Sequence, residues 1–491
     1  MITDMFGSFA PMMPMVIMII GALVMPALYF ITKSRRLLPA ASLVVIAASA
    51  IMTFLMLEAG YTGTYGSLFT FDAFSGLMLL LFQTVVFLAV LISGSSIETT
   101  RMHVGAYYSL LLGATTGMMF VATASDLIAI FVGVEVVSIS SYALVAMKRN
   151  DPRAAEAAVK YVIIGGLSTA LTVYGISLLY GVTGSTNLMD IGAALATAQF
   201  SWAFVIAMIT MIAGYGFKIA AVPFHMWAPD VYEGAATPVS LFLATGSKKM
   251  GLVVFFKIFL ILFVVAQTAF ATAEIQYVFA IIAAITMTVG NVVAITQTNI
   301  KRMLAYSSIA QAGYIMIVLA VMNEYALTGG LFHMFTHVFM KGGAFIVVAA
   351  LINVGLGERI SDYKGLAKRA PLIAFAMMLF LFSLAGIPPL AGFTSKFVLF
   401  SAAIYDPATG VMSQWVWLAF IAILNSAISL YYYTKVVKTM YIDKPKDDAE
   451  KIQIPKTFMA AMVLCLVFVI VLGVYPQLIL DLCANAAAAF F

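Results

Sequence analysis

The sequence contains few charged residues. Only 10% of its 491 residues are Asp, Glu, Lys or Arg, whereas 63% are hydrophobic. Because soluble domains carry about 25% charged residues, the low charge excludes a soluble globular protein. A membrane-spanning helix needs about 20 consecutive apolar residues, and such stretches follow one another along the whole chain. We therefore expect an all-α polytopic membrane protein.

Cysteine is also nearly absent. Cys465 and Cys483 lie close to the end of the sequence, and no Cys-x-x-Cys pair exists to hold zinc, haem or an iron–sulfur cluster. The sequence contains no Gly-rich phosphate loop, no nucleophile elbow and no basic nucleic-acid patch. No segment between apolar stretches reaches about thirty residues, which is too short for a nucleotide domain. We expect this chain to bind no cofactor, metal or nucleic acid itself, so that any redox centre belongs to another protein.

About fourteen apolar stretches are long enough to cross a membrane. They lie near residues 12–32, 37–57, 72–93, 104–123, 126–147, 156–182, 201–233, 238–266, 274–297, 303–323, 327–354, 372–402, 414–440 and 457–480.

Basic residues occur only on alternate connections between these spans. The opposite connections contain no Lys or Arg. By the positive-inside rule, the basic connections are cytoplasmic and both termini lie outside. The basic connections contain Lys33, Arg35, Arg36, Arg101, Lys148, Arg149, Arg153, Lys301, Arg302, Arg359, Lys364, Lys368, Arg369, Lys444, Lys446, Lys451 and Lys456.

Two of the spans are too long for simple helices and contain proline. Span 201–233 includes Pro223, and span 372–402 includes Pro388 and Pro389. Proline lacks a backbone N–H and clashes with the preceding turn, so both helices are expected to be discontinuous, as in transporters that bind ions at mid-membrane depth.

These discontinuous helices are the seventh and twelfth, so they run in opposite directions. This relation favours two inverted-topology repeats of five helices. The predicted division is 1–103 for the first three helices, 104–266 and 274–441 for the repeats, and 442–491 for the last helix.

Five ionisable side chains fall deep inside predicted spans. At about 2.5–3.5 kcal/mol each, their insertion costs on the order of 12–17 kcal/mol, which is comparable to the stability of a whole domain. Such a cost indicates a function. The five residues are Glu135, Lys218, Lys248, Lys341 and Lys396.

These groups favour a proton pathway over buried ion pairs that lock helices together. One carboxylate cannot neutralise four ammonium groups. Burial penalises a charged lysine and a nearby carboxylate offsets that penalty, so moving one charge switches protonation. Glu135 and Lys218 form the expected switching pair. Because lysine donates hydrogen bonds and offers no oxygen ligand, the groups favour protons over sodium.

In the eleventh span, His333, His337 and Lys341 recur every four residues, which aligns them on one helical face. The alternatives are a hydrated proton stripe, a hydrogen-bonded packing stripe or a metal site, although no third metal ligand accompanies the histidines. The tenth span presents a similar polar face that either holds water or joins helices. That face contains Ser307, Gln311 and Tyr314.

His225 follows Pro223 in the seventh span. It either relays protons toward the cytoplasm or satisfies backbone carbonyls that the break frees.

Several local motifs together resemble the antiporter-like membrane subunits of the complex I superfamily. The resemblance covers residues of about 100–440 and is strongest for the N-type subunit. The motifs are Phe131–Glu135, Ser141–Leu144, Glu156–Tyr161, Tyr180–Leu188, Phe217–His225, Pro229–Gly234, Gln297–Arg302, Ala305–Ser308 and Gly386–Lys396.

This resemblance implies residue roles. Glu135 and Lys218 correspond to the switching pair of a first half-channel, Lys248 to the central lysine, and Lys396 to the exit lysine of a second half-channel. Gln311 departs from the N-type pattern, in which histidine is frequent, and His333, His337 and Lys341 are more similar to the L- and M-type subunits. These departures fit an archaeal member whose complex oxidises a reduced deazaflavin coenzyme, with NADH as the alternative donor.

The expected function is therefore that of a proton-translocating, non-redox subunit of a respiratory dehydrogenase in a prokaryotic plasma membrane. The resemblance implies partners of two kinds, namely antiporter-like and small membrane subunits, and peripheral subunits with flavin and iron–sulfur clusters. A subunit of a multi-subunit cation/proton antiporter is the main alternative, and an inert structural spacer is another.

Overall fold

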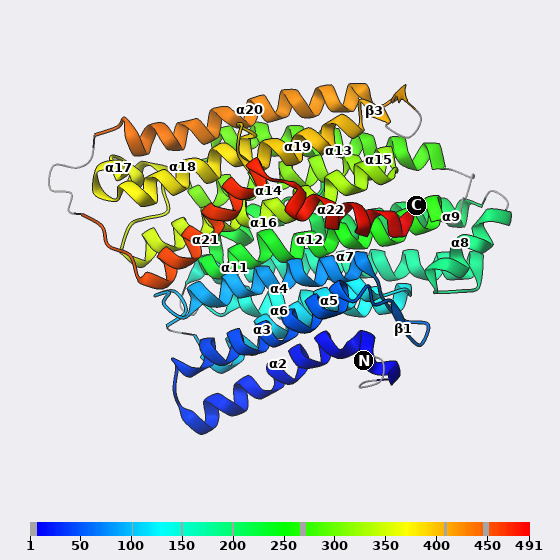
Figure 1. The fold of residues 1–491 in the computed structure, drawn as a ribbon, viewed down its shortest axis with the longest axis horizontal. Helices are drawn as coiled ribbons and strands as arrows, with labels where there is room; N and C mark the ends of the chain where they lie inside the picture. The colour runs from blue at the N-terminus through cyan, green and yellow to red at the C-terminus, as the bar shows by residue number, and fades with distance from the viewer. Residues whose placement is uncertain are drawn as a thin grey trace.

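A computed structural model describes residues 7–100, 102–148, 151–198, 201–265, 272–406, 410–444 and 451–491. The described chain is a bundle of helices that run parallel to the long axis of the molecule (Figure 1). Up to residue 265 its helices are η1 (Gly7–Met12), α2 (Met13–Thr32), α3 (Leu37–Glu58), α4 (Ala73–Ser93), α5 (Val104–Thr123), α6 (Leu127–Ala146), α7 (Pro152–Thr183), α8 (Leu188–Thr197), α9 (Trp202–Ile219), α10 (Trp227–Gly234), α11 (Thr237–Phe242), η2 (Leu243–Ser247), α12 (Lys248–Phe255) and η3 (Phe256–Val265).

The remaining described helices form the second half of the bundle. They are α13 (Thr272–Thr296), α14 (Ile300–Ile315), α15 (Ile317–Val321), α16 (Glu324–Asn353), η4 (Ile360–Tyr363), α17 (Leu366–Arg369), α18 (Pro371–Ala385), α19 (Ala391–Ala402), α20 (Val416–Tyr441), α21 (Lys456–Val474), α22 (Gln477–Ala487) and η5 (Ala488–Phe490).

The predicted fold class is confirmed. Within the described ranges, twelve helices, with η1–α2 and α14–α15 each taken as one, are long and apolar enough to cross a membrane. The expected spans 238–266 and 372–402 are not among these twelve because both are divided into shorter segments. Segments α11, η2, α12 and η3 follow without a gap, with η2 and η3 wound as π-helix, and α18 and α19 flank a break. The total of fourteen spans stays a prediction.

Both predicted interruptions are present. Helix α9 ends at Ile219, and Ala220 then adopts a left-handed φ of 54° before a cis bond to Pro223. Helix α18 ends in the same way, with Gly386 at a φ of 91° before a cis bond to Pro389. Glycine adopts this conformation without a Cβ clash. The chain resumes as α10 and α19, so the seventh and twelfth spans are discontinuous helices.

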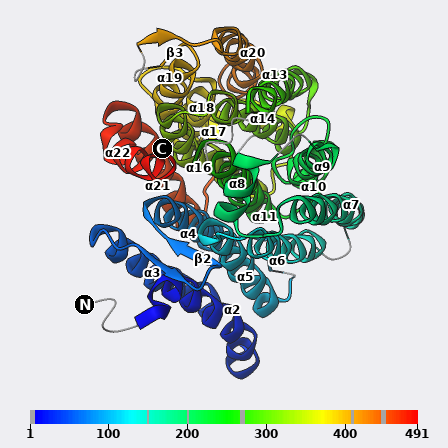
Figure 2. The same ribbon diagram turned by 90° about the vertical axis from the view of Figure 1, so that its right-hand side faces the viewer.

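Helix α16 forms the centre of the bundle (Figure 2). Every residue from Ala326 to Leu351 is buried. The helix packs against α4, α11, α14, α18, α19, α21 and α22. A fully buried helix requires partners for its polar side chains, and the polar residues of α16 therefore face neighbouring helices.

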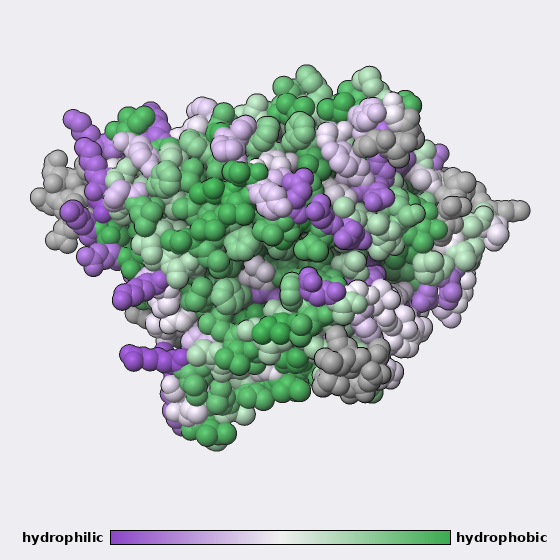
Figure 3. All heavy atoms as spheres, in the orientation of Figure 1, coloured by the Kyte–Doolittle hydropathy of each residue, from purple (hydrophilic) through white to green (hydrophobic). Residues whose placement is uncertain are grey.

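The two ends of the bundle differ in charge. The α2–α3 connection, α17 and the end of α20 lie at the left in Figure 1, whereas η1 and the end of α22 lie toward the right. The right-hand end also carries two antiparallel hairpins, β1 (Gly63–Tyr65) with β2 (Phe69–Phe71) and β3 (Tyr405–Asp406) with β4 (Val411–Met412). Figure 3 shows hydrophobic side chains over the middle and protruding hydrophilic side chains at the left-hand end.

Candidate functional site

The first polar site joins α6, α7 and α9 inside the bundle. Glu135 lies in the middle of α6, where its carboxylate accepts a 2.8 Å hydrogen bond from Thr169 of α7. One turn along α6, Ser138 accepts a 2.7 Å hydrogen bond from the ammonium group of Lys218, which lies in the last turn of α9. Carboxylate and ammonium thus bind neighbouring hydroxyls, and no ion pair of 4.0 Å or less joins them within the described chain.

A small cavity connects this carboxylate with this ammonium group. Glu135, Thr169, Ser138 and Lys218 all line it, together with residues of α6, α7 and α9. The space available to the centre of a water molecule is about 10 Å³, close to the minimum that holds one water. A single water there can bridge the predicted switching pair.

Lys248 lies at the centre of the bundle, directly after the π-helical segment η2. Its ammonium nitrogen is buried without a hydrogen-bond partner and lies 5.5 Å from the centre of the Tyr232 ring. Buried polar atoms without protein partners mark positions for ordered water. Several others lie on the helices around Lys248: the hydroxyls of Ser141, Tyr161, Tyr232, Ser247 and Ser308.

Helices α14 and α16 carry the polar groups of the second half. The ammonium group of Lys341 donates to Ser307 at 2.5 Å and to the carbonyl of Leu304 at 3.1 Å. Ser307 also contacts the hydroxyl of Tyr433 on α20. The predicted polar face of the tenth span therefore touches the predicted stripe of the eleventh span directly.

His333 is fixed by two hydrogen bonds. Its Nε2 pairs with the side-chain oxygen of Gln311 at 2.8 Å and its Nδ1 with Ser395 at 2.9 Å. Both ring nitrogens are therefore occupied, which leaves none for a metal. Among the described residues, no group of three or more His, Cys, Asp or Glu side chains is arranged to hold a metal ion. This environment favours the packing alternative for His333.

His337 differs from His333 although it lies one turn away on the same face. The ring centres of the two histidines are 6.3 Å apart. His337 is buried, and neither of its ring nitrogens has a hydrogen-bond partner. Because an imidazole both donates and accepts, this environment favours the hydrated alternative for His337.

Lys396 closes the break in the twelfth span. Its ammonium group donates to the carbonyls of Leu384 and Ala385 at 2.7 and 3.1 Å, and to Ser426 at 2.9 Å. Those carbonyls belong to the last turn of α18, where helix carbonyls lack intrahelical partners and favour a cation. The Tyr314 ring lies 5.0 Å from the same nitrogen.

His225 lies in the break between α9 and α10. Its Nδ1 is buried and makes no hydrogen bond within the described chain, and Trp227 nearby donates to the carbonyl of Phe217 at 2.9 Å, which also accepts from the backbone N–H of Ala220. Both alternatives for His225, a proton relay and a partner of carbonyls at the break, stay predictions.

Sequence reasoning missed several groups that bind the predicted residues. Ser138 binds Lys218, and Tyr433 binds Ser307. Asn291 donates a hydrogen bond to the Tyr314 hydroxyl at 2.9 Å. The spacing of Ser138 from Glu135, one helical turn, was an available signal. Tyr433 lies on a helix distant in sequence, so no local pattern pointed to it.

Lys301 was predicted in a connection between spans, but the structure places it inside a helix. It lies in the first turn of α14 and is 0% exposed. Its ammonium group donates to the carbonyls of Glu233 and Ala235 at 2.9 and 2.8 Å, and pairs with Glu358 at 3.1 Å. These carbonyls flank the end of α10, which attracts a cation.

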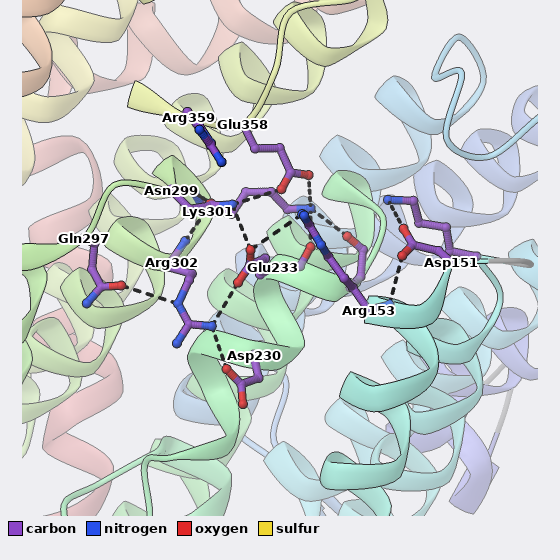
Figure 4. Close-up of polar contacts among 12 residues, drawn as sticks. Asp151, Arg153, Asp230, Glu233, Gln297, Asn299, Lys301, Arg302, Glu358 and Arg359 are labelled. Carbon is purple, nitrogen blue, oxygen red and sulfur yellow. Dashed lines mark hydrogen bonds and ion pairs between the residues drawn. The ribbon is translucent and has the colours of Figure 1, made fainter. Parts of the chain in front are cut away.

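An ion-pair network surrounds Lys301 and joins the two halves of the bundle (Figure 4). Arg302 of α14 binds Asp230 and Glu233 of α10 at 2.6 and 2.9 Å. Burial alone would raise the pKa of Glu358, but the charge of Lys301 and the hydrogen bond from Asn299 outweigh it and hold this pKa below its usual value. The described contacts thus fasten α10 to α14 at the basic end.

Comparisons with known proteins agree with this geometry. Residues 124–429 match the family model described as NADH:quinone oxidoreductase/Mrp antiporter, transmembrane. The chain is 41% identical to subunit N of F(420)H(2) dehydrogenase from Methanosarcina mazei, over 83% of both chains. It is 40% identical to subunit N of NADH-quinone oxidoreductase from Heliobacterium modesticaldum, over 88% of both.

A solved structure shares the fold. A chain of respiratory complex I from Thermus thermophilus superposes with a TM-score of 0.79 at 29% identity, covering 96% of this chain and 99% of that one. Together with the family match over more than half of the sequence, this confirms the predicted resemblance. The chain belongs to the NADH:quinone oxidoreductase/Mrp antiporter transmembrane family.

Proposed function

We propose that this chain moves protons across the membrane through its buried lysines, as a subunit that carries no redox centre itself. The observation that carries the proposal is a row of four lysines, each at most 4% exposed, in a membrane interior that holds a single carboxylate at mid-depth. The row begins at Glu135 and contains Lys218, Lys248, Lys341 and Lys396.

The Glu135 carboxylate acts as the switch of the first half. Lys218 binds a neutral hydroxyl, and the carboxylate that lines the same cavity favours the charged form of this lysine. Glu135 and Lys218 lie more than 4.0 Å apart, and bringing the two charges to about 4 Å would make them interact by about 4 kcal/mol in a protein environment of intermediate dielectric. Moving one charge across about 100 mV costs about 2.3 kcal/mol. A small displacement of Glu135 is therefore sufficient to load or release a proton.

Water and neutral groups connect the switch with the second half. The unpartnered hydroxyls around Lys248 provide donors and acceptors for ordered water. His337 and Lys341 continue this row on α16, and Ser307 and Tyr433 follow them. Lys396 ends the row at the break between α18 and α19. His225 lies beside the first break as a further relay toward the basic end.

The parent assembly is a redox-driven complex in a prokaryotic plasma membrane. Its electrons pass through peripheral subunits that carry flavin and iron–sulfur clusters, and its other membrane subunits are antiporter-like or small. Relatives at 41% and 40% identity are named for F(420)H(2) and for NADH, so a reduced deazaflavin coenzyme and NADH stay alternatives for the electron donor. The basic end faces the cytoplasm, which leaves both termini outside.

Purification of the full-length chain through a tag tests the assembly. We expect mass spectrometry to identify iron–sulfur and flavin proteins that co-purify in mild detergent, and the same proteins to be absent from an untagged strain. Recovery of small membrane antiporter subunits alone would contradict the respiratory proposal and support the antiporter alternative.

A further inference from the structure

A polar pocket lies at the basic end of the second half, away from the proposed proton path. Its volume is about 560 Å³. The walls come from the connection after α13, from η4 with its flanking residues, and from the end of α20. The lining residues are Gln297, Thr298, Arg359, Ile360, Ser361, Lys364, Lys435, Thr439 and Asp443.

Cations outnumber carboxylates in this pocket. Arg359, Lys364 and Lys435 line it against one acidic residue, Asp443. None of the three cations forms an ion pair of 4.0 Å or less with a described carboxylate, although ion pairs bind Lys301 and Arg302 close by. Within the described residues, the Lys435 ammonium makes only a long contact of 3.5 Å, to the carbonyl of Ile295. The pocket therefore has an excess of positive charge available to a ligand.

The pocket lies where two helices present apolar surface. Helices α13 and α20 pack side by side (Figure 2), and Asn425 of α20 donates to Thr288 of α13 at 3.0 Å. Their outer faces expose large apolar side chains, including Ile285 and Val292 on α13 and Leu424 and Tyr431 on α20. A ligand held in the pocket can extend apolar chains along these faces.

We propose that this pocket binds the phosphate head group of an anionic phospholipid. Arginine and lysine are the usual partners of phosphate oxygens, and basic pockets at the cytoplasmic ends of membrane helices are suited to acidic lipid head groups. The hydroxyls of Thr298 and Ser361 add neutral donors. The adjoining apolar faces favour a lipid over a soluble phosphate compound, and the inference does not depend on proton transport.

Native mass spectrometry of the full-length chain in mild detergent tests the pocket. We expect phosphatidylglycerol to bind at least about tenfold more tightly than phosphatidylcholine, and the triple variant Arg359→Gln, Lys364→Gln, Lys435→Gln to lose this preference. The control triple variant Lys33→Gln, Arg36→Gln, Lys456→Gln removes the same charge from exposed sites elsewhere. The control keeps the preference if the pocket is the binding site.

Two further variants guard against a folding defect. We expect Lys364→Gln alone, at an exposed position, to weaken the binding of phosphatidylglycerol about threefold. The double variant Lys364→Arg, Lys435→Arg retains both charges and is expected to bind phosphatidylglycerol as the wild type does. Equal losses in both triple variants would overturn the pocket assignment. The lipid assignment would be overturned if inorganic phosphate bound with the same affinity as phosphatidylglycerol, because the lipid chains would then add nothing to binding.

Discussion

The two halves of the bundle break a helix in the same way but use their lysines differently. In the first half Lys218 precedes the break and donates a hydrogen bond to Ser138 of α6. Glu135 of the same helix lines the cavity beside it. In the second half Lys396 follows the break and donates back to two carbonyls in the last turn of α18. The first lysine is therefore placed near a carboxylate and the second beside backbone dipoles.

The two halves also differ in whether a carboxylate lies near their buried lysines. Between residues 274 and 441, every carboxylate lies at the end of a span or outside it: Glu274, Glu324, Glu358, Asp362 and Asp406. The second half consequently cannot change the charge state of Lys341 or Lys396 by moving an acidic group of its own. We infer that the first half drives proton loading and that the second half conducts.

The largest expected effect is that of Lys218→Ala. Removing the ammonium group eliminates the site that Glu135 controls, so we expect proton pumping to fall at least about tenfold while the complex still assembles. Acidification of inverted membrane vesicles measures this. The nearby control Thr210→Ala removes a hydroxyl that is bonded within its own helix, and we expect it to retain pumping. Full pumping in Lys218→Ala would contradict the assignment of proton loading to the first half.

Replacing Lys396 is expected to lower the stability of the protein more than replacing Lys218. Lys396→Met removes a hydrogen bond to a charged donor from each of the Leu384 and Ala385 carbonyls, which keep only the neutral donors Gln311 and Ser426, at a cost of about 1.5–3 kcal/mol for hydrogen bonds to a charged group. Lys218→Met frees only a hydroxyl. We expect the larger decrease in thermal stability for Lys396→Met, measured by unfolding of the purified chain in detergent. Equal decreases would show that Lys396 does not close the break.

The two histidines of α16 provide a comparison within the second half. His337→Ala removes an unpartnered relay and is expected to slow pumping several-fold with little change in stability. His333→Ala removes two hydrogen bonds, to Gln311 and Ser395, and is expected to lower stability by about 1–3 kcal/mol. Vesicle acidification and thermal unfolding of both variants measure the two effects. A larger loss of pumping in His333→Ala together with a larger loss of stability in His337→Ala would contradict the assigned roles.

The smallest expected effect concerns the contact between the halves. The pKa of Glu358 lies below its usual 4.5 because Lys301 and Asn299 outweigh burial. Its contribution is therefore complete above about pH 4.5 and is lost as the pH falls through the lowered folded-state pKa. We expect Glu358→Gln to cost about 1 kcal/mol at neutral pH and progressively less in acid. A cost independent of pH would exclude the ion pair as its source.

Much of this arrangement was predictable from the sequence. Burial cost alone identified Glu135 and the four lysines, and proline identified both breaks. The structure has both breaks and buries the four lysines, because a charge or a proline inside an apolar run is costly wherever the helix packs, whereas the roles of these residues stay predictions. The four-residue spacing also placed His333, His337 and Lys341 on one face.

Other features depended on contacts between distant segments. The sequence did not separate His333 from His337, because Gln311 and Ser395 come from other helices. Lys301 was expected in a connection, yet the end of α10 and Glu358 draw it into a buried position. Chain periodicity contains no information about which helix ends meet, and so it could not predict either result.

Proton pumping by the Glu135→Gln complex tests the central claim most directly. The substitution removes the charge that controls Lys218 and keeps the shape of the side chain. We predict that vesicle acidification driven by the natural electron donor falls at least about tenfold, with all subunits present in the purified complex. Acidification at the wild-type rate in that assembled complex would contradict the switch in the first half.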